Sequence, residues 1–207
     1  MGSRDADRGG KAAAQLGARA VQLDVTDDAS VQAAEAAIAT DGGLDVLINN
    51  AGIQREMRGA DDVLGAAELT VEQMRETFET NVFGTVRVLR AFLPLLQRSA
   101  APVVVNVSSG LASLTRVSTP GSRAYAYPGV AYPASKTVVN MITVQYAKAF
   151  PAMRINAVEP GFTSTDLNGN AGFQTVEQGA EIIVRMAQTD PDGPTGGYFS
   201  AEGALPW

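Results

Sequence analysis

The 207-residue sequence contains neither cysteine nor histidine. Without cysteine the chain can form no disulfide and can use no thiolate for catalysis or metal binding. Without histidine it has no Ser-His-Asp triad and no histidine-ligated zinc, so we expect no metal site. Acid–base chemistry must therefore use Tyr, Lys, Asp or Glu.

Long apolar runs and an excess of positive charge are also missing. No stretch approaches the roughly 18 apolar residues that a membrane span needs. The polar N-terminal segment, MGSRDADRGGKAAAQ, lacks the apolar core of a signal peptide, so we expect a cytoplasmic protein with no membrane partner. The net charge of −6 and the pI near 4.7 argue against nucleic acid as a partner.

The residues that are present suit a single domain over residues 1–207, because 45% of them are hydrophobic. Short β-branched runs alternate with longer segments of helical periodicity. Strands are predicted at 18–25, 44–52, 101–109 and 153–161, and helices at 27–40, 70–99, 135–150 and 175–189. Thr70 and Gln73 form a capping-box pattern, and Asp28 or Ser30 is expected near the start of its helix. This alternation predicts an α/β fold with a mostly parallel sheet and helices on both faces.

Polar residues cluster where the predicted strands end, which is where ligands bind in such sheets. These are Asp24, Asn49–Gly52, Ser108–Ser109 and Pro160–Thr165. The irregular segment Gly110–Gly129 follows one of these strands and is expected to form a lid or wall near the site, or else a surface insertion without a role.

Tyr132 and Lys136 are four residues apart at the start of a predicted helix, so they should share one helical face. A nearby ammonium stabilises a phenolate, and Lys136 is therefore expected to lower the pKa of Tyr132. Ser109 ends the preceding strand and could hydrogen-bond the oxygen of a substrate, to which Tyr132 gives a proton or from which it takes one. Taken alone, a Tyr-x-x-x-Lys pattern could equally be a surface coincidence.

Other segments allow both a functional and a purely structural interpretation. The small residues of Asn49–Gly52 allow close approach to a ligand, or they form a simple turn. Asn81 is a poor helix former inside a predicted helix, so a buried Asn81 needs partners, one of which could be a water connected to Lys136. Asp24 could accept a hydrogen bond from an adenine amino group, or it could cap the next helix.

In order along the chain, the segments LDVTD, NNAG, NVFGT, NVSS, YPASK and PGFTSTD resemble the motifs of the short-chain dehydrogenase/reductases. The resemblance covers nearly the whole chain and implies a Rossmann-like doubly wound parallel sheet. The C-terminal GPTGGYFSAEGALPW and the long segment before Tyr132 are similar to the carbonyl-reductase-like branch, whose members tend to be monomeric and to prefer NADPH. NADP(H) is thus the implied cofactor, with NAD(H) possible, and monomer or homo-oligomer stays open.

The resemblance also implies site residues and a reaction. Hydride would pass between the nicotinamide and a small-molecule carbonyl or secondary alcohol. The implied catalytic residues are Asn81, Ser109, Tyr132 and Lys136. The implied cofactor-binding residues are Arg4, Asp24, Val25, Asn50, Ala51, Gly52, Tyr132, Lys136, Pro160, Gly161, Thr163 and Thr165. Phe83, Leu111, Leu114, Phe162 and Leu167 could line an apolar substrate pocket or could simply pack.

The sequence departs from the family at its front. The Gly-rich turn that binds the pyrophosphate is missing, and the pattern implies that the first strand, the first helix and most of the second strand are absent. An unpaired edge is then expected on the strand before Asn49. Arg4 could meet the 2′-phosphate of NADP or be a solvated terminal residue. The alternatives are a fragment of a complete reductase, a decayed paralogue, or a repurposed protein that acts as a binding partner or as a lyase or isomerase without nicotinamide.

Overall fold

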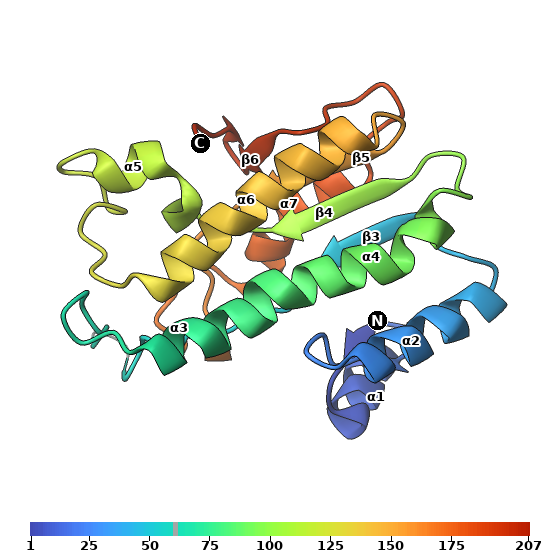
Figure 1. Cartoon of the computed structure of the whole chain (residues 1–207), viewed down its shortest axis with the longest axis horizontal. Coiled ribbons are helices and arrows are strands. Elements are labelled where there is room, and N and C mark those ends of the chain that lie inside the picture. Colours follow the sequence, from blue (N-terminus) through green and yellow to red (C-terminus); the bar gives the residue numbers. More distant parts are fainter. Residues whose placement is uncertain (60–61) are drawn as a thin grey trace.

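The computed structural model of the chain describes residues 1–59 and 62–207. A five-stranded sheet forms the centre of the molecule (Figure 1). Its order is β3-β4-β5-β6-β7, with parallel pairing throughout except that β7 is antiparallel to β6. The strands are β3 (Val46–Asn49), β4 (Val103–Val107), β5 (Arg154–Val158), β6 (Tyr198–Ser200) and β7 (Gly203–Ala204).

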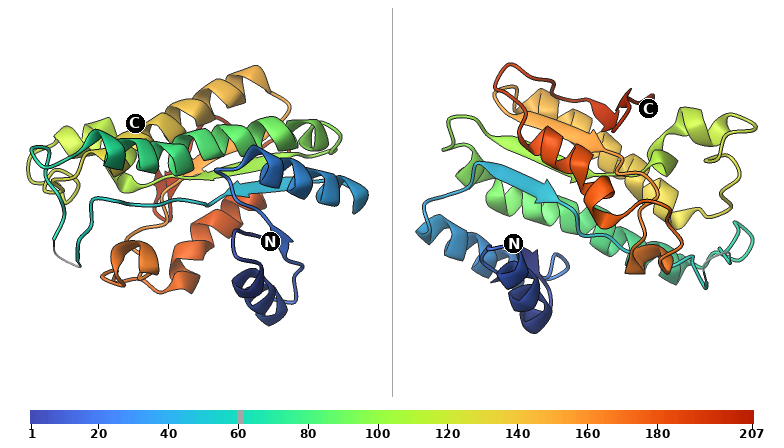
Figure 2. Two further views of the ribbon diagram at one scale, coloured as in Figure 1. Left: turned by 60° about the horizontal axis from the view of Figure 1, so that its bottom comes forward. Right: turned by 180° about the vertical axis from the view of Figure 1, so that it is seen from behind.

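Helices cover both faces of this sheet (Figure 2). The longer ones are α1 (Ala6–Gln15), α2 (Asp28–Thr40), α4 (Gly84–Leu96), α6 (Ala131–Ala149) and α7 (Val176–Ala187). The shorter ones are α3 (Val71–Phe78), α5 (Leu114–Ser118), η2 (Gly110–Ala112) and η3 (Asp166–Asn168). In the left view of Figure 2, α4 and α6 lie on one face of the sheet and α7 lies on the other.

The residues of β4 explain how one strand joins the two helical layers. All five of its residues are buried. Val104 packs with Leu89 of α4, while Val105 packs with Ile182 of α7, because successive side chains point to opposite faces. The continuous apolar run is therefore typical of a strand that is covered twice. The predicted fold class, a Rossmann-like α/β fold with helices on both faces of a parallel sheet, is confirmed.

The N-terminal residues form a second, smaller sheet. In it β1 (Gly2–Ser3) pairs in parallel with β2 (Val21–Gln22), and neither strand is hydrogen-bonded to the five-stranded sheet. The predicted strand at 18–25 was too long, because β1 offers only two residues for pairing and Asp24 bonds Thr26 in a turn. Within the described residues, β3 pairs only with β4, so its other edge is open, and Ile48 is 42% exposed there. This is the edge that the resemblance predicts to be unpaired.

The long helix predicted at 70–99 contains an irregularity. It begins with the predicted capping box of Thr70 and Gln73 but passes through a π-helical turn, η1 (Glu79–Phe83), between α3 and α4. The cap of α2 is Asp27, rather than the predicted Asp28 or Ser30. The helix that carries Lys136 begins at Ala131, so Tyr132 lies in its first turn.

None of the helices in the described part of the chain combines the length and apolarity that crossing a bilayer requires.

Candidate active site

Tyr132 and Lys136 lie on the same face of α6, as their spacing predicts. The Lys136 Nζ is 5.8 Å from the centroid of the Tyr132 ring, and both residues are buried. Lys136 Nζ donates a hydrogen bond of 2.8 Å to the carbonyl oxygen of Val107, the last residue of β4. The ammonium is therefore fixed at the carboxyl end of β4.

Ser109 meets Tyr132 from the segment that follows β4. Its hydroxyl lies near enough to the Tyr132 phenol to lower the pKa of that phenol, and it accepts a hydrogen bond from the amide of Leu111 at 3.2 Å. The neighbouring Ser108 points elsewhere, because its hydroxyl donates to Asn140 Oδ1 at 2.7 Å. Of the two serines, it is Ser109 that the fold brings to the phenol.

The ionisation of this pair differs from the sequence-based expectation. Burial raises the pKa of Tyr132 to about 12; the nearby Ser109 hydroxyl lowers it in part, and the charge of Glu159 raises it further. Burial also lowers the pKa of Lys136 to about 8. The prediction that the Tyr132 pKa is lowered is wrong for this structure, because burial is the largest cause of the shift and Lys136 is not among its causes. At neutral pH the phenol is protonated and can act as a proton donor.

Asn81 connects three segments of the site from inside the π-helical turn. Its Oδ1 accepts from the amide of Ile53 at 2.8 Å, and its Nδ2 donates to the Ile53 carbonyl at 3.0 Å and to Ser135 Oγ at 2.9 Å. The side chain is 1% exposed and thus fully committed to these protein partners. π-helical turns recur at functional sites because they displace one residue from the regular helical pattern.

Gly52 completes this cluster. A Cβ at this position would lie 3.4 Å from Lys136 Nζ and 3.5 Å from Asn81 Oδ1. Any larger side chain would therefore enter the space that the amide and the ammonium share. Gly52 follows Asn50 and Ala51, whose side chains are exposed after the end of β3.

The predicted adenine-side residues gather at the ends of β1 and β2. Asp24 Oδ1 accepts from the amide and the hydroxyl of Thr26, at 2.9 and 2.7 Å, and these bonds lower the Asp24 pKa. The charge of Arg4 contributes to the same lowering, so Arg4 and Asp24 lie near one another, with Arg4 exposed. Val25 packs against Gly84, and its carbonyl oxygen accepts from Arg87 Nη1 at 2.7 Å.

The predicted nicotinamide-side residues follow β5. Pro160 and Gly161 come directly after the strand, and Gly161 has a φ of +84°, which favours glycine. Thr163 packs closely against Gly179 of α7, and Thr165 caps η3. Their side chains therefore stabilise the loop itself.

The irregular segment Gly110–Gly129 contacts this loop. Arg123 lies over the ring of Phe173 at 5.1 Å, and Phe173 in turn packs edge-on against Phe162 with 6.0 Å between ring centroids. Four of the apolar residues suggested as pocket lining are substantially exposed: Phe83 (52%), Leu114 (63%), Phe162 (43%) and Leu167 (37%).

Three features make the residues near Tyr132 fit the nicotinamide half of a dinucleotide. Lys136 uses one of its three N–H donors on Val107, and no ion pair of Lys136 occurs within residues 1–59 and 62–207. Gly52 leaves room beside it. Gln174 Oε1, next to Gly161, is a buried acceptor that finds no hydrogen-bond partner among the residues that the structure describes.

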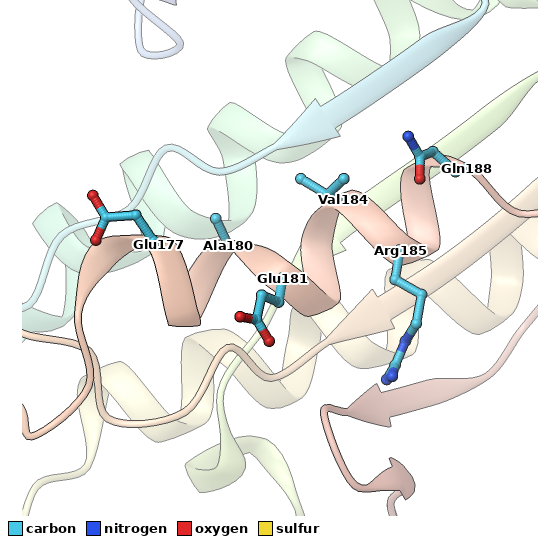
Figure 3. Close-up of a pocket in the computed structure, with 6 residues that line it drawn as sticks. All are labelled: Glu177, Ala180, Glu181, Val184, Arg185 and Gln188. Atoms are coloured by element: carbon cyan, nitrogen blue, oxygen red, sulfur yellow. The ribbon is translucent and has the colours of Figure 1, made fainter.

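A separate depression of about 530 Å³ lies on the outer side of α7 (Figure 3). It is lined by Glu177, Ala180, Glu181, Val184, Arg185 and Gln188. None of the predicted site residues lines it, so it is not the Tyr132 site. The described residues contain no cluster of three or more acidic side chains placed to hold a metal ion.

Several residues that shape the site carry no signal in the sequence. Glu56 contacts the start of α6, and Gln54 Nε2 donates to the Tyr127 hydroxyl at 2.5 Å. Arg87 binds Val25, Asp28 and Glu79 at once. These contacts join residues far apart in the chain, and neither spacing nor periodicity could have indicated them.

The chain is similar to proteins of known family and known structure. The family model described as short chain dehydrogenase matches residues 1–175. The (+)-neomenthol dehydrogenase of Capsicum annuum is 32% identical, over 86% of this chain and 76% of the relative. Salutaridine reductase from Papaver somniferum has a TM-score of 0.81 at 27% identity, covering 97% of this chain and 90% of that one. NADPH-bound carbonyl reductase from chicken fatty liver has a TM-score of 0.78 at 25% identity, covering 100% and 84%.

Proposed function

This chain belongs to the short-chain dehydrogenase/reductase family and is an oxidoreductase of that family, and on this premise we propose that it is an NADP(H)-dependent carbonyl reductase with Tyr132 as the proton donor. The observation that carries the proposal is a buried, protonated phenol that lies near the Ser109 hydroxyl and one helical turn from an ammonium. A phenol in that state is ready to protonate the oxygen of a ketone as it is reduced.

Each residue of the site has a role in this mechanism. Ser109 and Tyr132 hydrogen-bond the substrate oxygen, which orients the carbonyl and stabilises its developing negative charge. Tyr132 Oη then gives its proton to that oxygen. Lys136 holds the ribose hydroxyls with its remaining N–H donors and supports reprotonation of the phenol. Asn81 keeps Gly52 and Ile53 in place beside Lys136. Bound NADPH supplies the hydride.

The cofactor would lie across the carboxyl ends of the strands. Pro160, Gly161, Thr163 and Thr165 would border the nicotinamide, and Asn50, Ala51 and Gly52 the ribose. Asp24 and Val25 would border the adenine, and Arg4 would meet the 2′-phosphate. The nearness of Arg4 to Asp24 at the ends of β1 and β2 supports this assignment. The buried acceptor Gln174 Oε1 supports the nicotinamide side.

The substrate would be an apolar ketone or secondary alcohol. Exposed apolar side chains such as Phe162 and Leu114 support this class, as does the similarity to the (+)-neomenthol dehydrogenase of Capsicum annuum. Menthone, a ring ketone, is therefore a reasonable first probe.

The decisive experiment is Tyr132→Phe, with NADPH oxidation followed in the presence of menthone and other ring ketones. We expect turnover to fall by about 10²–10⁴-fold, because the proton donor is lost. NADPH binding, measured by fluorescence titration, should change less than about threefold, because removing one hydroxyl leaves the ring and its packing in place. Undiminished turnover in the variant would refute the role of Tyr132.

A second variant tests the cofactor. Arg4→Ala should weaken NADPH binding by about tenfold and leave NADH binding nearly unchanged, because only NADPH carries the 2′-phosphate. Arg8→Ala, an exposed arginine in α1, is the control. Equal effects of Arg4→Ala on the two cofactors would contradict the assignment of NADP(H).

A non-catalytic binding role is the second candidate. The edge of β3 that has no partner strand among the described residues favours it. It predicts a folded, monodisperse chain that binds neither NADPH nor NADH.

A further inference from the structure

We infer that Glu56 is a positioning residue that holds the catalytic end of α6 in place through the backbone of Tyr132 itself; this inference rests on the proposed function. Glu56 is completely buried, with 0% of its surface exposed. Its Oε1 accepts from the amides of Val130 and Ala131, the latter at 2.6 Å. Its Oε2 accepts from the amide of Tyr132 at 2.8 Å.

The start of α6 has no cap of its own. Val130, at the cap position, makes no side-chain hydrogen bond to the helix. The first amides of a helix lack partners within the helix and carry partial positive charge, so a carboxylate is the best acceptor for them. Glu56 supplies that carboxylate from about 75 residues earlier in the chain, whereas α3 and α7 are capped by their own Thr70 and Thr175.

The segment that carries Glu56 is held on both sides. Before it, Ile53 is bonded through its amide and carbonyl to Asn81. After it, the amide of Leu64 donates to the Glu56 carbonyl at 2.8 Å. One short segment thus connects Asn81 to Tyr132, and a shift of Glu56 would move the phenol relative to Ser109.

A carboxylate is the group that this geometry requires. It is an acceptor at both oxygens and meets three N–H donors. An amide at the same position would offer one oxygen and turn its NH₂ group toward a backbone N–H. Glu56→Gln therefore keeps the size of the side chain and removes half of the contact.

The first test uses the unmodified chain and needs no activity. Amide hydrogen exchange followed by NMR should show Ala131 and Tyr132 protected on the order of 100-fold more than Val176 and Glu177, the corresponding first-turn amides of α7. Equal and rapid exchange at both helix starts would overturn the Glu56 contact. This result stands whether or not the chain reduces ketones.

The second test compares Glu56→Gln with Glu68→Gln, a half-exposed carboxylate of the following segment that pairs with Arg58. We expect Glu56→Gln to lower kcat for menthone reduction by about 10- to 100-fold, with the NADPH Kd changed less than threefold, because the phenol is misplaced while the cofactor contacts remain. Glu68→Gln should leave both unchanged. An unchanged kcat in folded Glu56→Gln would overturn the positioning role. If Glu56→Gln does not fold, the hydrogen-exchange comparison of the starts of α6 and α7 tests the Glu56 contact instead. If the unmodified chain reduces no ketone, that result contradicts the proposed function and leaves the exchange test of Glu56 valid.

Discussion

The two ends of the proposed cofactor site are held together in different ways. Around Tyr132, hydrogen bonds join side chains of η1 and α6 to the segments that follow β3 and end β4. The two-stranded sheet at the N-terminal end is joined to the rest through α2 and the side chain of Arg87. Asn81 and Lys136 each bond a residue of another segment near the phenol. At the other end, α2 packs on α4 in an apolar cluster that includes Val31 and Phe92. The reacting groups are thus positioned by buried polar bonds, and the adenine side by packing and one arginine.

Because of this difference, substitutions at the two ends should affect different properties of the protein. Changes near Tyr132 should alter turnover more than cofactor affinity, because they move the reacting atoms. Changes at the N-terminal end should alter cofactor affinity and stability more than turnover.

Apart from loss of the Tyr132 hydroxyl, the largest effect is expected from Asn81→Ala. The substitution removes the bonds to Ile53 and Ser135, so the turn beside Lys136 is no longer fixed. We expect turnover with menthone to fall by about 100-fold, because small displacements of reacting groups are costly. The NADPH Kd should change less than threefold. Thr80→Ala, on the adjacent residue of the same π-helical turn, is the control; a similar loss in both variants would mean that the helix, and not the Asn81 amide, is what matters.

A smaller effect is expected on stability as pH rises. The Lys136 pKa is lowered by burial to about 8, from an ordinary value of 10.5 in the unfolded chain. Between these values the unfolded chain binds the proton that the folded chain has lost, so the free energy of unfolding should increase with pH, by about 1–3 kcal/mol from pH 7.5 to 9.5. Tyr132 acts in the opposite direction at higher pH: its pKa is raised to about 12 from 10, so its stabilising contribution is present below pH 10 and lost between 10 and 12.

Urea unfolding at a series of pH values measures this dependence. Lys136→Met should flatten the rise between pH 7.5 and 9.5. Lys148→Met, at an exposed position of the same helix, should keep it. A rise that survives Lys136→Met would show that another group is responsible.

The smallest effect is expected from Arg87→Ala. Arg87 donates to the Val25 carbonyl at 2.7 Å, to Asp28 at 2.5 Å and to Glu79 at 3.0 Å. Because two of these partners are largely open to solvent, we expect a loss of only about 1 kcal/mol in the free energy of unfolding. NADPH affinity should fall a few-fold with kcat retained. Arg90→Ala, an exposed arginine of the same helix, is the comparison, and a loss of kcat without loss of affinity would reverse the proposed division between the two ends.

The sequence predicted the parts of the molecule that depend on local geometry. The apolar run of β4, the capping box at Thr70 and the shared face of Tyr132 and Lys136 follow from residue spacing alone. The alternation of strand and helix patterns was enough to predict the parallel sheet with helices on both faces.

Properties that depend on the tertiary environment of a residue could not be predicted from residue spacing. The pKa of Tyr132 was predicted in the wrong direction, because it depends on how much solvent the folded chain removes. The contact of Glu56 with α6 joins residues about 75 positions apart and involves backbone amides, which carry no sequence signature. The strand at 18–25 was predicted too long, since strand length depends on the partner strand as well as on propensity.

The π-helical turn at Glu79–Phe83 joins α3 and α4 into one continuous helix, and the relative rotation of its two parts depends on the number of residues in the turn as well as on their type. Such a turn accommodates about one residue more than a regular turn. One residue advances a helix by about 100°, so removing Glu79 or Thr80 would leave the composition of the helix nearly intact and rotate the whole of α3 relative to α4. The direction in which the Asn81 amide points therefore depends on the number of residues in this segment. A one-residue gap here between two homologous chains would change the geometry of the site more than most substitutions.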